Sequence, residues 1–114
     1  MPIETKYLLI ASMDVAAEFE NLFNEVYEEH AGYIRQVPGV RHVTRIKGEP
    51  FAIMIGGEAK PMAAPDPVYT ALYEIDDPKV LTSPEWIAAC EAGRWPSEIR
   101  PRTRKRAHFV YKVT

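Results

Sequence analysis

Histidine and tyrosine are the residue types in this chain whose spacing suggests chemistry. His30 continues an apolar stripe at helical spacing, and it is therefore expected to face a sheet rather than solvent. The earlier members of this stripe are Phe19, Leu22 and Val26. A buried, neutral imidazole is able to act as a general base near pH 7. The alternative is a structural histidine whose hydrogen bonds fix the helix to the sheet.

Aromatic and arginine side chains supply further candidates. Phenol hydroxyls donate hydrogen bonds to an oxygen that becomes negatively charged during a reaction. The aromatic residues predicted to wall a binding site are Tyr7, Tyr69, Tyr73, Tyr111, Trp86 and Trp95. Arg45 or Arg106 is a candidate for holding a carboxylate through two parallel hydrogen bonds. The alternatives are core or interface packing for the aromatic residues, and solvation of a strand edge for the arginines.

The sequence predicts neither a metal site nor a phosphate site. The histidines at 30, 42 and 108 lack the HxH, HxxxH or HExxH spacing, and no glycine-rich phosphate loop is present. Cys90 is the single cysteine, so an intrachain disulfide is excluded and a reducing cytoplasm is expected. It is predicted to be a small buried hydrophobe, with a catalytic thiol as the alternative. We therefore expect no metal and no cofactor.

Length and composition indicate the class of protein. With 114 residues, the chain is expected to form one domain, residues 1–114, with its own core. A hydrophobic share of 46% and a charged share of 26% are typical of globular proteins. The formal net charge of -2 argues against general nucleic-acid binding. No signal peptide and no apolar stretch of transmembrane length are visible, so we expect a cytoplasmic protein that does not bind membranes.

Four strands and two helices are predicted to position the candidate residues. The strands span residues 5–13, 40–47, 68–75 and 102–113, and in the last of these the side chains are expected to alternate regularly. The helices span 14–36 and 84–93, with Asp14 and Ser83 as N-caps. The order predicts an α+β fold, a ferredoxin-like β-α-β-β-α-β antiparallel sheet with both helices on one face.

Residues 49–67 interrupt this pattern and are predicted to be a long loop or insertion. An apolar run at 51–55 is compatible with a short extra strand, and three prolines follow at 61, 65 and 67. Long loops of this kind often cover binding sites. The alternative is an insertion that packs against a dimer partner.

The strands are apolar on both faces, although two helices cover only one. In the first strand, Leu8 and Ile10 point to one side, and Leu9 and Ala11 point to the other. A second copy of the chain is the simplest cover for the remaining face. A homodimer whose sheets pair with each other is therefore expected.

Two segments resemble the EthD-like group of dimeric α/β-barrel proteins. The first reads FNEVYEEH over 23–30, then VPGV over 37–40 and Arg45; the second reads YTALYEI over 69–75, then Asp77-Pro78 and SPEW over 83–86. The resemblance covers most of the chain outside 49–66. It implies a ferredoxin-like subunit whose sheet pairs with that of a second subunit, and it adds Tyr27 to the candidates beside His30. Related barrels include cofactor-free monooxygenases, isomerases, cyclases and decarboxylases of aromatic or polyketide-like compounds, and some larger relatives bind haem.

These observations leave three functions open. The first is a small cofactor-independent enzyme that binds an aromatic or polyketide-like hydrophobic molecule and uses His30 for acid–base catalysis. Its predicted substrate-binding residues are Tyr7, Tyr27, Tyr69, Tyr73, Trp86 and Arg45. The second is a non-catalytic dimer that binds a hydrophobic small molecule or has an accessory role. The third is haem or oxygen chemistry.

Overall fold

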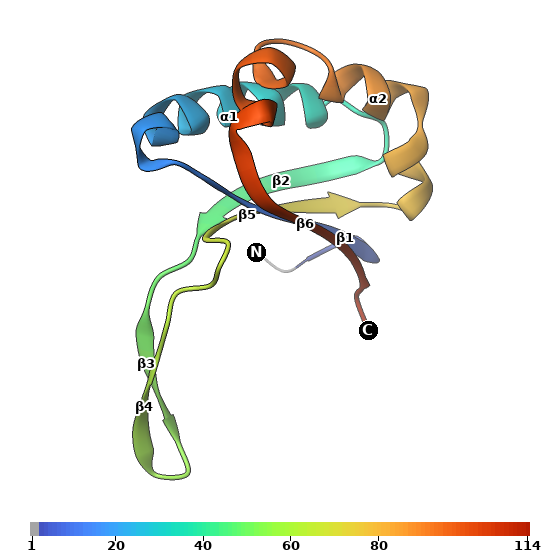
Figure 1. The fold of residues 1–114 in the computed structure, drawn as a ribbon. Coiled ribbons are helices and arrows are strands. Elements are labelled where there is room, and N and C mark those ends of the chain that lie inside the picture. Colours follow the sequence, from blue (N-terminus) through green and yellow to red (C-terminus); the bar gives the residue numbers. More distant parts are fainter. Residues whose placement is uncertain (1–2) are drawn as a thin grey trace.

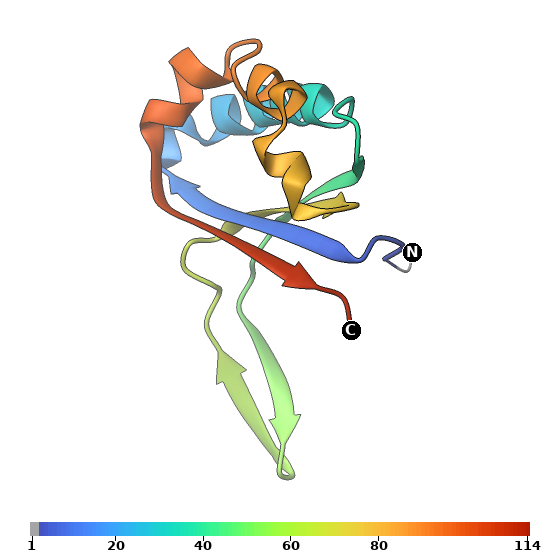
Figure 2. The same ribbon diagram turned by 90° about the vertical axis from the view of Figure 1, so that its right-hand side faces the viewer.

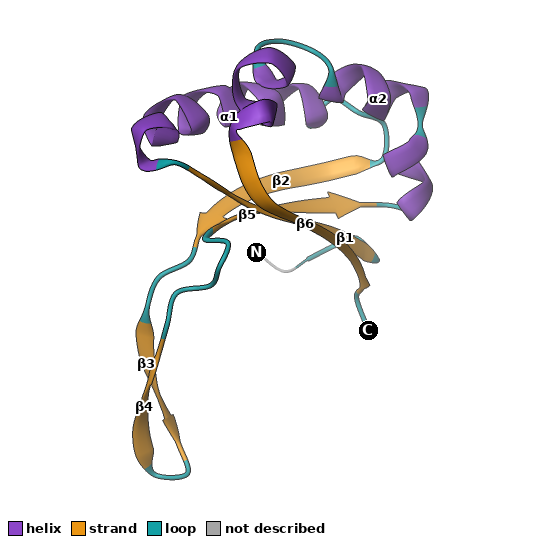
Figure 3. Ribbon diagram, in the orientation of Figure 1, coloured by secondary structure: helices purple, strands orange, loops and turns teal. Residues whose placement is uncertain are grey.

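The computed structural model describes residues 3–114, which form a four-stranded antiparallel sheet with helices on one face (Figures 1 and 3). The order of strands in the sheet is β2-β5-β1-β6. The strands are β1 (Tyr7–Val15), β2 (Val40–Lys47), β5 (Tyr69–Ile75) and β6 (Thr103–Lys112). Helices α1 (Glu20–Ile34) and α2 (Pro84–Cys90) lie on the same side of the sheet. The ferredoxin-like α+β fold predicted from the element order is therefore confirmed.

Alternation along the central strands builds the core between sheet and helices. In β1, Leu9, Ala11 and Met13 are buried, whereas the residues between them are partly exposed. The register places Leu9 opposite Tyr73 and Ala11 opposite Ala71. Cross-strand neighbours share a face, so these buried residues meet in one layer under α1. The side chains that complete the core from α1 are Phe23, Val26, Tyr27, His30, Ala31 and Ile34.

The first helix begins later than predicted. The prediction that Asp14 caps it is wrong, because Asp14 lies in β1 and its carboxylate accepts a hydrogen bond from the Val68 N–H at 2.8 Å. A single 3₁₀ turn, Ala17–Phe19, connects the strand to α1. Within residues 3–114, no side chain caps this turn or the start of α1. The Asp14 carboxylate, which the sequence predicts to cap the helix, therefore bonds to a residue that is distant in the sequence.

The second helix begins where the sequence predicts. The Ser83 hydroxyl accepts a hydrogen bond from the Trp86 N–H at 3.1 Å, and Pro84 occupies the first turn. The helix ends at Cys90 rather than near Gly93. Gly93 has φ 68°, and a Cβ there would lie 2.8 Å from the Glu29 carboxylate of α1, so glycine allows the chain to pass closely under that helix.

Strand β6 contains a bulge that regular alternation does not predict. Ser12 of β1 lies opposite Ala107, whereas Asp14 lies opposite Arg104. One residue of β1 therefore faces two residues of β6, at positions 105 and 106. The predicted alternation is wrong at this point, because the arginines at 104 and 106 lie on opposite faces instead of sharing one.

Lys105 forms the bulge and adopts an unusual backbone conformation. Its φ is 55°, in the left-handed region, which costs a residue with a side chain about 1–2 kcal/mol. Its ammonium group contacts both carboxylate oxygens of Asp66, at 2.8 Å and 3.0 Å. This ion pair connects the bulge to the segment that precedes β5.

Residues 51–62 form a hairpin that projects from the sheet. Strand β3 (Phe51–Ile55) occupies the predicted extra strand, and it pairs with β4 (Glu58–Met62), which the sequence does not predict. Figures 1 and 2 show this hairpin, called the arm below, on the side of the sheet away from the helices. At the base of the arm, the Gly48 N–H donates to the Val68 carbonyl at 2.8 Å. The arm is therefore anchored to the sheet at its base.

The sheet face away from the helices is called the open face. Ile46 of β2 and Phe109 and Tyr111 of β6 lie on it with about half of their surface exposed. The arm adds exposed apolar residues on the same side of the sheet, including Phe51 and Met54. Among residues 3–114, no helix combines the length and apolar character needed to cross a membrane.

Candidate functional site

A cavity of about 190 Å³ lies between the helices and the sheet. An apolar cavity of about 150 Å³ holds benzene, so this one has room for a single substituted ring. The sheet contributes Leu9, Ala11, Met13, Tyr73, Arg106 and His108 to its lining. The helical layer contributes Tyr27, His30, Trp86, Cys90, Trp95 and Arg100. The cavity thus combines an aromatic interior with a few polar groups, as ligand sites usually do.

His30 lines this cavity and is held by packing. Its side chain is 6% exposed, and its ring stacks on that of Trp95 with centroids 4.6 Å apart. Tyr27 contacts the same imidazole edge-on at 5.5 Å. Within residues 3–114, the buried Nδ1 atom has no hydrogen-bond partner. The interpretation of His30 as a histidine that hydrogen bonds the helix to the sheet is therefore not supported.

Burial sets the protonation state of His30. Loss of solvent lowers the pKa of this imidazole from 6.5 to about 4. The positive charge of Arg100 lowers the pKa further, whereas the negative charge of Glu91 opposes this. The imidazole is consequently neutral at pH 7, which is the form that accepts a proton or a hydrogen bond.

Two tyrosine hydroxyls meet across the cavity. Tyr27 of α1 and Tyr73 of β5 hydrogen bond to each other at 2.6 Å. Burial raises the pKa of both phenols, so both stay protonated at neutral pH. The two hydroxyl groups carry two protons, and the hydrogen bond between them uses one of these. The second proton is available to a ligand oxygen, whichever hydroxyl carries it.

The thiol of the cavity is not activated, and one of its arginines is paired elsewhere. Burial raises the pKa of Cys90, so its sulfur stays a protonated thiol and the alternative of a catalytic thiolate is not supported. The Arg100 guanidinium donates to the Cys90 carbonyl at 2.9 Å and forms an ion pair with Glu91. Arg100 therefore joins the segment before β6 to the end of α2.

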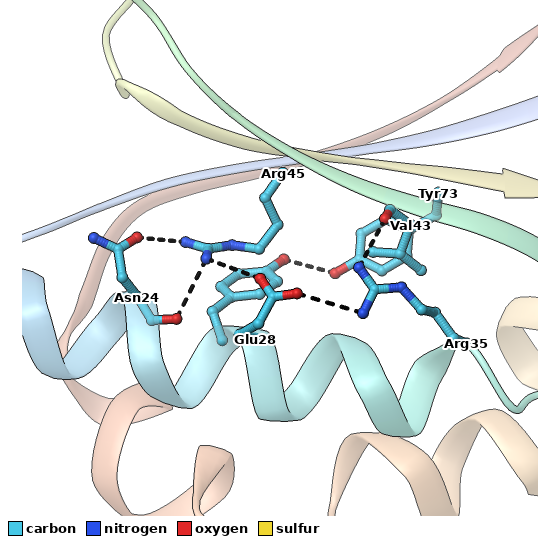
Figure 4. Close-up of polar contacts among 7 residues, drawn as sticks. Asn24, Glu28, Arg35, Val43, Arg45 and Tyr73 are labelled. Carbon is cyan, nitrogen blue, oxygen red and sulfur yellow. Dashed lines mark hydrogen bonds and ion pairs between the residues drawn. The ribbon is translucent and has the colours of Figure 1, made fainter. Parts of the chain in front are cut away.

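Arg45 performs a different task from the predicted one. Its guanidinium donates to the Asn24 side-chain oxygen at 2.6 Å and to the Asn24 carbonyl at 3.3 Å (Figure 4). It also contacts Glu28 at 3.4 Å and lies 4.8 Å above the ring of Tyr27. These contacts fix β2 to α1, and they engage both terminal nitrogens of the guanidinium, Nη1 and Nη2.

The structure gathers only part of the predicted site. The predicted residues that line the cavity are His30, Tyr27, Tyr73, Trp86, Trp95 and Arg106, and those that do not are Tyr7, Tyr69, Tyr111 and Arg45. The Tyr69 hydroxyl instead donates a hydrogen bond to the Glu20 carboxylate. Tyr69 and Arg45 border a separate void of about 10 Å³, which has room for one water at most. With Asn24, Ile46 and Lys47 they also line an open pocket of about 150 Å³. Tyr7 lies at the opposite end of β1 from this void, paired with Ile75.

The sequence assigned no role to Arg100 or to His108. Arg100 lies in an irregular segment between α2 and β6, where no periodicity indicates direction. His108 follows Arg106 by two positions in β6, so alternation alone places both on one face. No group of His, Cys, Asp or Glu side chains in residues 3–114 is arranged to hold a metal ion.

Two solved structures of MhuD have a similar fold. Each alignment covers 95% of this chain at 13% sequence identity. The haem-degrading MhuD of Mycobacterium tuberculosis with two haems in its active site has a TM-score of 0.60, with 95% of that chain covered. A point mutant of MhuD with two manganese protoporphyrin IX molecules per active site has a TM-score of 0.61, with 94% covered. No protein-family model and no curated protein matches the sequence.

Proposed function

We propose that this chain is a small enzyme that moves a proton on a compact aromatic or polyketide-like molecule without a cofactor. The observation that carries the proposal is the neutral imidazole of His30, which lines a cavity and has an unpartnered Nδ1. A histidine kept for structure alone would use its ring nitrogens for hydrogen bonds within the protein.

The geometry supports a reaction of the enolisation type. His30 takes a proton from a carbon next to a carbonyl, and the electron pair of the broken C–H bond moves toward the carbonyl oxygen. In the Tyr27–Tyr73 pair, one hydroxyl proton is not used in the mutual hydrogen bond. That hydroxyl donates a hydrogen bond to the carbonyl oxygen as the negative charge on this oxygen grows. His30 then returns the proton to the product. This proton transfer is balanced without an oxidant or a reductant.

Exchange of carbon-bound hydrogen for deuterium tests the proposal directly. We expect the protein to catalyse this exchange in single-ring aryl ketones or 1,3-diketones in deuterated buffer, followed by NMR. The substitution His30→Gln should reduce the exchange rate by about 100-fold or more. The control is His42→Gln, since His42 is an exposed histidine of β2. Equal exchange rates in the His30 variant and the unmodified protein would refute the role of His30.

A non-catalytic binding protein is the alternative, and the same cavity would serve it. Native mass spectrometry of the purified protein identifies a retained molecule. A protein that retains a ligand but catalyses no exchange on any carbonyl compound of matching size would favour this alternative over the enzyme.

Haem is a further candidate because the similar MhuD structures contain haem or a manganese porphyrin. The described residues do not fit it. The cavity of about 190 Å³ is smaller than the roughly 300–1,000 Å³ of pockets that hold drug-sized ligands. A shifted Soret band upon titration with haem would contradict this conclusion.

A homodimer completes the proposal. The open face and the arm expose apolar residues on the same side of the sheet, among them Phe109 and Phe51. An isolated two-stranded hairpin is marginally stable in water, so the arm also benefits from a partner. A second copy whose sheet covers the open face would lie beside the arm and bury both surfaces.

Sedimentation equilibrium tests the dimer. We expect Phe109→Asp to weaken it by at least about tenfold, because the substitution buries an unpaired charge in the interface. The control is Ile87→Asp on α2, where the parent side chain is 59% exposed compared with 57% for Phe109. A monomer at micromolar concentration before substitution, or equal effects of both substitutions, would exclude this interface.

The proposal keeps an EthD-like relationship, a single domain over residues 1–114 and a cytoplasmic location. The supporting observation for the relationship is that Tyr27 and His30, from the motif on which the resemblance rests, line one cavity. The protonated thiol of Cys90 is compatible with a reducing compartment.

A further inference from the structure

The cavity carries a positive charge that the acid–base mechanism does not use. Arg106 reaches the lining from β6, and within residues 3–114 it makes no ion pair. Arg100, in contrast, is paired with Glu91. In the part of the chain that the structure describes, no aspartate or glutamate lines the cavity. The excess charge at this site is therefore positive.

The bulge in β6 leaves Arg106 as the one arginine of its strand at the cavity. In a regular strand, Arg104 would share a face with Arg106. The register shift places Arg104 opposite Asp14 instead, on the open face. His108 stands two positions further along β6, and partial loss of solvent together with the charge of Arg106 lowers its pKa. A neutral imidazole therefore adjoins the guanidinium.

Charge and aromatic surface occupy different depths of the cavity. Arg106 is an exposed residue, so its guanidinium marks the mouth, where solvent meets the lining. Tyr27, Tyr73 and Trp95 are almost fully buried and form the interior. A ligand matching this division has an unsaturated ring at one end and an anionic group at the other.

We propose that the cavity selects aromatic acids, with the ring in the aromatic interior and the carboxylate on the Arg106 guanidinium. This inference rests on the proposed function, because it names the substrate class of the same cavity. A guanidinium offers two parallel N–H donors that match the two oxygens of a carboxylate. The volume of about 190 Å³ favours one ring over several.

Binding of an acid would also change the base. The pKa of His30 is held down by burial and by Arg100, and a bound carboxylate brings a negative charge into the same cavity. A nearby negative charge favours the protonated imidazole, so it raises the pKa of His30 toward neutrality. His30 then becomes a stronger base when an acid is bound than in the empty cavity.

Paired probes and paired variants test the inference. Benzoate and benzamide have nearly the same shape and differ in charge, so their dissociation constants, measured by NMR titration, isolate the contribution of the carboxylate. We expect benzoate to bind about tenfold or more tightly than benzamide. Arg106→Gln should remove this preference. Arg104→Gln removes the same charge from the same strand on the open face, and it should keep the preference.

The titration of the His30 ring gives an independent readout. We expect its NMR-measured pKa to rise when benzoate is bound and to stay unchanged with benzamide. Equal affinities for the two probes, no binding of either at millimolar concentration, or a preference that survives Arg106→Gln would each overturn the inference. Such a result leaves the deuterium exchange by His30 untouched, whereas lost exchange with an intact benzoate preference would overturn the proposed function.

Discussion

The two faces of the sheet are built from the same strands, but one face is buried and the other is exposed. On the helix-covered face, Ala11, Ala71 and Tyr73 are 2–3% exposed. On the open face, Phe109 and Tyr111 are 57% and 56% exposed. Both faces carry apolar residues, because neighbouring positions of the central strand β1, such as Leu8 and Leu9, are both apolar. The difference arises from the helices, which provide one layer where the sheet offers two surfaces.

This contrast separates residues kept for packing from residues kept for chemistry. The covered face already has its partner, yet it retains an unfilled volume of about 190 Å³ bordered by His30 and the Tyr27–Tyr73 pair. A buried polar atom without a hydrogen-bond partner costs stability, and within residues 3–114 the Nδ1 atom of His30 is such an atom. The open face also carries polar groups, but Ser12 and Thr70 at its centre hydrogen bond to each other, and its exposed apolar surface suits association rather than catalysis.

The largest expected effect compares one phenylalanine from each face. Phe23 of α1 is fully buried, so Phe23→Ala should cost about 3–5 kcal/mol of unfolding free energy through the cavity it leaves. Phe109→Ala should cost less than about 1 kcal/mol in dilute solution, where any dimer has dissociated. Urea denaturation measures both. Similar costs for the two substitutions would show that the faces do not differ in packing.

A second comparison uses pH. The pKa of His30 is about 4 in the folded chain and 6.5 ordinarily, so between these values the unfolded chain binds more protons. Stability due to the neutral His30 is complete above pH 6.5 and is lost as the pH falls through 4. The loss at pH 4.5 amounts to roughly 2–3 kcal/mol.

Urea denaturation of His30→Gln measures this contribution. The variant should lose less stability than the unmodified protein between pH 7.5 and pH 4.5, because glutamine does not titrate. The matched substitution on the open face is His42→Gln, since His42 is exposed. Parallel pH curves for the unmodified protein and the His30 variant would contradict burial of a neutral imidazole.

A smaller effect is expected when the hydrogen-bonded hydroxyl pairs of the two faces are compared. Tyr27 and Tyr73 share a buried hydrogen bond of 2.6 Å, and Ser12 and Thr70 share a half-buried one of 2.8 Å. Double-mutant cycles should give a coupling of about 1 kcal/mol for the tyrosines, replaced by phenylalanine, and less for the Ser12→Ala and Thr70→Val pair. Equal couplings would show that burial does not strengthen the tyrosine bond.

The smallest effect is expected outside the core. Arg41 and Asp76 form an ion pair at 3.0 Å whose side chains are 63% and 44% exposed. Solvent and salt screen such pairs, so Arg41→Gln should change the unfolding free energy by less than about 1 kcal/mol. The same denaturation measurement checks this value. A larger cost would mean that this edge of the sheet depends on charge more than the exposure of its side chains indicates.

Local patterns predicted the parts of the fold that depend on nearby residues. Ser83 and Pro84 begin a helix because a side-chain cap and a fixed φ act within one turn. Tyr27 and His30 are three positions apart in a helix, which is enough to place them on one face. The cavity residues from α1 were therefore accessible to sequence reasoning.

Features set by distant contacts were not accessible. Asp14 reads as a helix cap until the Val68 N–H, far along the chain, takes its carboxylate. The second strand of the arm contains Pro61 and charged residues, so its pairing with β3 overrides a weak strand pattern. Arg45 looked free to bind a carboxylate, but the side chain and carbonyl of Asn24 already accept its hydrogen bonds.

The bulge at Lys105 sets the valence of the anion that the cavity would accept. With regular pleating, Arg104 would join Arg106 at the mouth, about 7 Å away along one side of the strand. Two guanidinium groups at that spacing suit a dicarboxylate or a phosphate ester. The extra residue in β6 turns Arg104 to the other face of the sheet. The backbone bulge, rather than a change of side chain, therefore leaves one guanidinium to pair with one negative charge of a ligand.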